Sequence, residues 1–234
     1  MKVWESGVDR HPVSRGLMLL AYCSGEAWES LAALPIGRRD ARLLEVYERL
    51  FGPTMEAFAE CPQCSEPLEY SLSAADLRGD RGGPIEGDLI LDCDRYRLRL
   101  RLPNSVDLEA ASRLDDLSAA RRYLLECCIV EASHEGLSVP VHSVPDSLAG
   151  EIETHISQAD PQTEIAIRLS CTACQHSWQV LFDIERFLWV KFQALAKRIL
   201  REVHTLARAY GWSEAQILSL GAKRRQAYLE FVSG

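Results

Sequence analysis

Two Cys-x-x-Cys pairs constrain this chain most: Cys61 with Cys64, and Cys171 with Cys174. This spacing lets two thiolates approach one ion from a tight turn, and two such pairs supply the four soft ligands of a closed tetrahedral zinc site. The pairs are 106 residues apart, much farther than in an ordinary zinc ribbon. Because the entropy of loop closure grows only logarithmically with length, we predict one zinc ribbon split by an inserted subdomain.

Other interpretations of the two cysteine pairs stay open. They include reduced thiols without a metal, disulfides and a redox pair, although a redox Cys-x-x-Cys is expected at a helix start, where neither pair lies. Zinc ribbons often have glycine after each pair, whereas this chain has Ser65 and Gln175. His176 is a weaker candidate ligand. Four thiolates leave no coordination position open, so we expect one structural Zn²⁺ and no zinc catalysis.

Composition and charge restrict the class of protein further. The chain has 234 residues, 47% of them hydrophobic, and a formal charge of −8. This is enough for one sizeable folded unit or two small ones. The negative charge disfavours a general nucleic-acid binder. No signal peptide or run of about 20 apolar residues is visible, so we expect a soluble cytoplasmic protein without membrane contact.

Hydrophobic periodicity predicts an α+β fold. Apolar steps of three and four predict helices over residues 15–59 (including a short helix over 54–60), 115–130, 146–156, 183–210, 214–218 and a terminal segment. Alternation predicts strands around residues 68–72, 89–91, 95–102, 165–169 and 178–182, and residues 80–84 are a predicted loop. We therefore expect a mostly helical protein with a split zinc-ribbon β-module and a long C-terminal helix followed by short helices.

This pattern predicts four regions along the chain. They are an N-terminal helical region (1–59), the split zinc ribbon (60–75 plus 163–183), an inserted α/β subdomain (76–162) and a C-terminal helical region (184–234).

The C-terminal region differs from the rest in charge. Residues 185–234 carry nine Lys or Arg and four Asp or Glu, a balance of +5, whereas residues 1–184 carry −13. The basic run at 223–225, with Arg224 and Arg225, is more often a solvated helix start than a binding patch. Because cations at a helix start oppose the helix dipole, a contact with a partner is more favoured here than for an average charge run. Trp189 and Trp212 are core residues or interface anchors, and Tyr228 follows in the same segment.

Two other features have a structural and a functional interpretation. Arg95, Arg97, Arg99 and Arg101 share one face of a predicted strand, which suits a phosphate groove, but pairing with acidic neighbours such as Glu69, Asp92 or Asp94 is the better interpretation. The adjacent Cys127 and Cys128, like Cys23 and Cys93, are expected to pack in the core. We find no nucleophile paired with a base and no phosphate-binding loop.

Several motifs together resemble a known family. The most specific stretch is residues 182–230, with Phe-Asp-Ile at 182–184, Glu-Val-His-Thr-Leu-Ala at 202–207 and Tyr-Gly-Trp-Ser-Glu at 210–214. Upstream, Gly-Pro at 52–53, Cys-Pro-Gln-Cys at 61–64 and Leu-Pro-Asn-Ser at 102–105 fit longer members that carry an inserted ribbon. From about residue 34, the chain is similar to the T-even phage baseplate hub assembly chaperone family, found with contractile phage tails and phage-tail-like injection systems.

The resemblance implies a role without catalysis. It predicts a chaperone of hub or spike assembly, or a minor baseplate component incorporated into the particle, whose partners are hub or spike proteins of the same gene cluster. On this interpretation Trp189, Trp212, Arg224, Arg225 and Tyr228 are the candidate partner-binding residues. The alternatives are a zinc-ribbon nucleic-acid-binding protein and, less favoured, an enzyme that uses Cys127 or Cys128.

Overall fold

The computed structural model describes residues 2–78 and 89–233, and the predicted loop at 80–84 lies outside them. The chain forms two compact units, one of residues 10–186 and one that joins residues 1–9 to 187–234. No helix within the described ranges is long and apolar enough to cross a membrane. The four-region division expected above stays a prediction.

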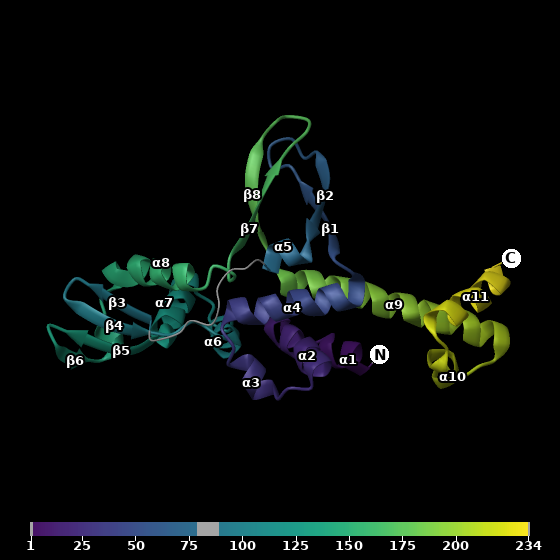
Figure 1. Ribbon diagram of the computed structural model, residues 1–234, viewed down its shortest axis with the longest axis horizontal. Helices are drawn as coiled ribbons and strands as arrows, with labels where there is room; N and C mark the ends of the chain where they lie inside the picture. Colours follow the sequence, from purple (N-terminus) through teal and green to yellow (C-terminus); the bar gives the residue numbers. More distant parts are fainter. Residues whose placement is uncertain (1, 79–88, 234) are drawn as a thin grey trace. The chain divides into compact units, whose positions relative to one another are not determined.

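Figure 1 shows helices and short β-hairpins in both halves of the sequence, as an α+β fold requires. The larger unit contains α2 (Pro12–Ser24), α3 (Trp28–Ala32), α4 (Ile36–Phe51), β1 (Thr54–Glu60), β2 (Pro67–Ser73), α5 (Ala74–Arg78), β3 (Leu89–Cys93), β4 (Tyr96–Leu100), α6 (Ser105–Ala111), α7 (Leu117–Cys128), β5 (Ile129–His134), β6 (Leu137–Val139), two 3₁₀ turns (Val141–Ser143 and Asp146–Leu148), α8 (Ala149–Ala159), β7 (Ile165–Ser170) and β8 (Ser177–Phe182). The smaller unit contains α1 (Lys2–Gly7), most of α9 (Ile184–Tyr210), α10 (Glu214–Ser219) and α11 (Ala222–Ser233).

The short helix predicted over residues 54–60 is wrong, because this segment is strand β1. It pairs along its whole length with β2 in an antiparallel hairpin, from Thr54 opposite Ser73 to Glu60 opposite Pro67. Met, Ala and Glu favour a helix locally, but the alternating side chains of β2 provide a partner that overrides this preference. The hairpin buries Met55 completely. The first hairpin therefore begins at residue 54.

A four-stranded antiparallel sheet, ordered β3-β4-β5-β6, is formed by the middle of the larger unit's sequence. Its core contains Leu98, Leu100, Ile129, Leu148 and Ile152, so α8 packs on the sheet. The predicted helix over 115–130 is two residues too long, since β5 begins at Ile129. The β5–β6 hairpin was not predicted, although Glu135-Gly136, both at positive φ, is a two-residue turn of the kind that joins antiparallel strands.

The smaller unit confirms the predicted C-terminal helices. Gly211 ends α9 with a φ of 68°, the left-handed conformation that glycine adopts without strain. Ser213 and Gln216 form a capping box at the start of α10. Leu206 and Ile217 are fully buried.

A buried charged junction connects distant parts of the larger unit. The guanidinium group of Arg39, on α4, donates to Asp40 Oδ1 at 2.8 Å and to Ser105 Oγ at 3.2 Å, and it lies 3.4 Å from a carboxylate oxygen of Glu185. The N–H of Gly37 donates to the buried carboxylate of Asp160 at 2.9 Å. A Cβ at Gly37 would lie 1.9 Å from Asp160 Oδ1, so this approach requires glycine.

The junction contains more carboxyl groups than the single guanidinium group of Arg39 can neutralise. Burial raises the pKa of Glu185 to about 7 and that of Asp40 to about 6, although Arg39 acts in the opposite direction on both. Glu185 is 7% exposed, and its Oε1 atom is buried without a hydrogen bond among the described residues. Ionisation of Glu185 therefore opposes folding.

This predicts an unusual dependence of stability on pH. Because the pKa of Glu185 is higher in the folded state than its ordinary value of 4.5, its contribution to stability is full below about pH 4.5 and is lost as the pH rises through 7. Between pH 4.5 and pH 8, the wild-type free energy of unfolding should fall by about 3 kcal/mol more than that of Glu185→Gln, measured by urea unfolding. The exposed Glu164→Gln variant is the control. Identical profiles for wild type and Glu185→Gln would contradict the prediction.

Candidate metal centre

Each cysteine pair lies in the turn between two paired strands, between β1 and β2 and between β7 and β8. In the first turn the N–H of Cys61 donates to the carbonyl of Glu66 at 3.0 Å, and the N–H of Ser65 donates to the carbonyl of Cys61 at 2.8 Å. The second turn repeats this pattern from Cys171 to His176 at 2.8 Å and from Gln175 to Cys171 at 3.0 Å. The two segments are therefore the same local structure formed twice.

The residue after each pair has a left-handed backbone. Ser65 has a φ of 60° and Gln175 a φ of 61°. This is the position where many ribbons have glycine, and a side chain there costs roughly 1–2 kcal/mol because of its Cβ. Ser65 and Gln175 thus adopt the backbone of a metal-binding turn despite the strain, which removes the objection that their identities raised.

The four thiols converge in space, as the sequence predicted. Cys61 Sγ lies 3.6 Å from Cys174 Sγ, and Cys64 Sγ lies 3.6 Å from Cys171 Sγ. All four sulfur atoms lie within 4.8 Å of one another. Four sulfurs around one zinc ion at 2.3 Å would be separated by about 3.8 Å, the edge of the tetrahedron. The thiols are thus spaced as a single tetrahedral metal requires.

The four thiols differ in burial and in acidity. Cys61 and Cys171 are each 1% exposed, while Cys64 and Cys174 face solvent more. Burial disfavours the Cys61 thiolate, but the backbone N–H groups of Cys64 and Gln63 outweigh it and lower the pKa of Cys61 to about 7. The backbone N–H of Glu66 favours the Cys64 thiolate, but hydrogen bonds with the neighbouring thiols outweigh it and raise the pKa of Cys64 to about 12, and the pKa of Cys174 is raised as well. His176 is outside the four-residue cluster and stacks 6.0 Å from Trp178, measured between ring centres. A metal bound here would have four thiolate ligands and no open position for a substrate.

Three of the candidate partner-binding residues, Trp212, Arg224 and Tyr228, form one cluster, and Trp189 lies outside it. Trp212 and Tyr228 pack edge to face with ring centres 4.9 Å apart, and the guanidinium group of Arg224 lies 5.8 Å from the Tyr228 ring centre. Tyr210, which was not predicted, stacks on Trp212 at 4.7 Å. The sequence could have indicated Tyr210 as a neighbour of Trp212, because it lies two residues before Trp212, on the other side of the glycine that ends α9. Trp189 is 6% exposed and does not belong to this cluster.

Arg225 has a structural contact that the sequence did not reveal. It pairs with Glu202 of α9 at 3.0 Å and donates to the carbonyl of Leu220 at 2.7 Å, and its side chain is 13% exposed. It therefore ties α11 to α9. Arg224 is exposed and available to a partner.

The four arginines in and next to β4 (Tyr96–Leu100) are paired with carboxylates. Arg95 pairs with Glu135, Arg97 with Asp92, Arg99 with Glu131, and Arg101 with Asp107. The predicted pairing with Asp92 is confirmed, and the other partners come from elements that were not predicted to be adjacent. This arrangement leaves little positive charge for nucleic-acid phosphates.

The remaining cysteines show mixed outcomes. Cys128 is buried as expected, and burial raises its pKa to about 12, which leaves almost no thiolate for nucleophilic chemistry. Cys93 and Cys127 are partly buried. The expectation that Cys23 packs in the core is wrong, because this residue is exposed near the end of α2.

Comparison with known proteins identifies the family. The family model described as T4 bacteriophage base plate protein matches residues 18–189, most of the chain. The match covers both cysteine pairs and the larger unit, and it ends soon after the start of the C-terminal stretch on which the resemblance was most specific. No curated protein and no solved structure matches the chain. The chain belongs to the T4 bacteriophage base plate protein family.

The backbone of the two turns yields a stability prediction. Replacing Ser65 or Gln175 with glycine removes the strain of a side chain on a left-handed backbone. The free energy of unfolding of each variant should therefore be higher than that of the wild type by about 1 kcal/mol. Thr172→Gly, inside the second turn but without a positive φ, is the matched control and should give no gain. Chemical denaturation measures the difference. A loss of stability in both Ser65→Gly and Gln175→Gly would contradict the assigned turn geometry.

Proposed function

We propose that this chain is a non-enzymatic assembly factor or minor structural component of the baseplate of a contractile phage tail or phage-tail-like injection system, acting at the hub or spike. Membership of the base plate family is the observation that carries the proposal. The closed set of four thiols supports a structural role, because it leaves no metal position free for catalysis. On this proposal the protein is made in the cytoplasm and then acts on, or enters, the tail-like particle.

One Zn²⁺ held by Cys61, Cys64, Cys171 and Cys174 would stabilise the two hairpins. A two-stranded hairpin is marginally stable in water, and strands β2 and β8 contain no fully buried residue. A metal that joins their turns would supply the missing free energy, as in other small zinc modules.

The zinc proposal predicts the metal content of variants. Protein purified without chelator should contain about one zinc per chain by elemental analysis, and Cys61→Ser or Cys171→Ser should lose it. Cys23→Ser, which changes an exposed cysteine outside the cluster, should keep it. Zinc retained in full by both ligand variants would rule out the four-thiolate site.

The docking surface proposed for hub or spike proteins is the aromatic and basic cluster of Tyr210, Trp212, Arg224 and Tyr228. Aromatic residues and arginine are enriched in binding hot spots because they bury a large area at a small entropic cost. The cluster lies in the part of the chain with net charge +5, so an acidic surface on the partner is expected.

Co-purification tests this surface. Tagged wild-type protein should recover hub or spike proteins of the same gene cluster, and Arg224→Glu should reduce recovery about tenfold by reversing one interface charge. Arg113→Glu changes an exposed arginine of the larger unit and should have no effect. Recovery of nucleic acid instead of baseplate proteins, with steep loss at higher salt, would favour the zinc-ribbon nucleic-acid alternative.

A further inference from the structure

Strand β3 has an open edge. It pairs with β4 on one side, and among residues 2–78 and 89–233 it has no strand neighbour on the other. Cys93 and Tyr96 close a two-residue turn, so they form a hydrogen-bonded pair, and hydrogen-bonded pairs recur at every second position. Leu89, Leu91 and Cys93 therefore bond to β4. The N–H and C=O groups of Ile90 and Asp92 face the open edge.

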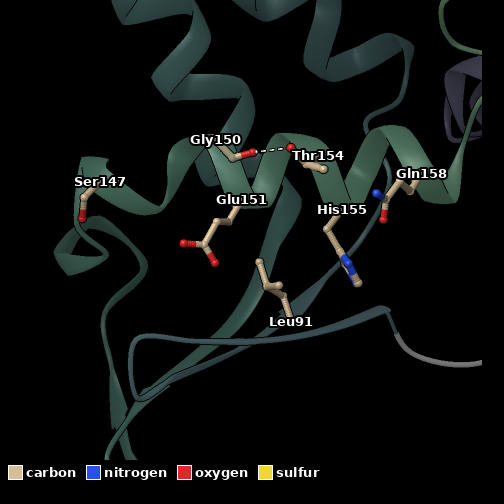
Figure 2. A pocket seen from close by; sticks show the side chains of 7 residues that line it. All are labelled: Leu91, Ser147, Gly150, Glu151, Thr154, His155 and Gln158. Atoms are coloured by element: carbon tan, nitrogen blue, oxygen red, sulfur yellow. Dashed lines mark hydrogen bonds between the residues drawn. The ribbon is translucent and has the colours of Figure 1, made fainter.

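A groove lies between this strand and helix α8, as Figure 2 shows. Its volume is about 490 Å³. Leu91 projects from β3 toward α8, while Glu151 and His155, one helical turn apart, project from α8 toward the strand. The groove is also lined by Ser147, Gly150, Thr154 and Gln158. Adding a Cβ at Gly150 would meet no atom within 4 Å, so this end of the groove is open.

Edge strands are usually protected, because unpaired backbone groups invite another strand. The carboxylate of Asp92 pairs with Arg97 of β4 at 3.2 Å, so its charge is held toward the neighbouring strand. Ile90 is apolar. Within the described residues, neither side chain therefore places a free charge at the open edge. A strand added there would place every second side chain beside the α8 residues Glu151 and His155.

The charge of the groove selects the partner. Glu151 is exposed and, among the described residues, interacts with the uncharged Cys93 thiol but with no cation, and Asp94 directly follows the last residue of β3. A second copy of this chain added at the same edge would present its own β3, Leu89–Cys93, which carries no lysine or arginine. A strand carrying lysine or arginine would supply the missing cation.

We propose that β3 and α8 form a docking site for an extended, basic segment of another protein, which adds to the edge of β3 as a fifth strand of the sheet. Backbone hydrogen bonds to Ile90 and Asp92 provide affinity, and Glu151 provides preference for a cationic side chain. This site lies in the larger unit and is separate from the aromatic and basic cluster of the smaller unit.

Binding of short synthetic peptides tests the site. The probes are seven-residue fluorescent peptides in which valine alternates with lysine, with glutamate or with serine, measured by anisotropy against the full chain. The lysine peptide should bind most tightly, and the amides of Ile90 and Asp92 should become protected from hydrogen exchange. Failure of the lysine peptide to bind more tightly than the glutamate peptide would overturn the proposal.

Two variants separate backbone pairing from charge. Ile90→Pro removes an outward N–H without removing a bond to β4, and should weaken the lysine peptide about tenfold. Glu151→Lys should reverse the preference toward the glutamate peptide, whereas Glu153→Lys, on the same helix but paired with Arg121, should not. Unchanged binding in Ile90→Pro would exclude strand addition. A concentration-dependent dimer abolished by Ile90→Pro would assign the edge to a second copy instead.

Discussion

Four thiols, supplied in pairs by turns more than 100 residues apart, converge within 4.8 Å of one another where the two hairpins turn. Each hairpin alone buries few side chains: Met55 from the first, and Ile165 and Leu169 from the second. Such hairpins are marginal by themselves, so their stability depends on what joins their turns. The sulfur positions match one tetrahedral ion, and Ser65 and Gln175 have the left-handed backbone that glycine provides in many zinc ribbons.

Other contacts join the long segment between the cysteine pairs to the rest of the larger unit. Arg39 lies near the start of α4 and contacts Ser105, the first residue of α6, and Glu185, at the start of α9. The carboxylate of Asp160, just after the end of α8, accepts a hydrogen bond from the N–H of Gly37 and so caps the start of α4. These buried groups join segments from the N-terminal helices, the insertion and the chain after the second hairpin. Burial raises the pKa of two carboxyl groups in this junction, Glu185 and Asp40, although Arg39 lowers both.

Much of this architecture was predictable from local patterns. Alternation identified β2, β4, β7 and β8, and a long apolar seam with a glycine and a capping box identified α9 and α10. Spacing identified all four members of the thiol cluster. The predictions that failed have physical causes. The residues of β1 favour a helix, but pairing with β2 makes the segment a strand. Arg225 forms an ion pair with Glu202 of another helix, which the sequence pattern does not show. Pairing between distant residues leaves no periodic signal in a single sequence.

The central claim is that one metal with four sulfur ligands closes the split ribbon of this base plate family member. X-ray absorption at the zinc edge, on the intact chain purified without chelator, tests it most directly. The account predicts a first coordination shell of four sulfur atoms at about 2.3 Å. A shell containing nitrogen or oxygen in place of sulfur, or protein without zinc whose cysteines are joined in disulfides, would contradict it.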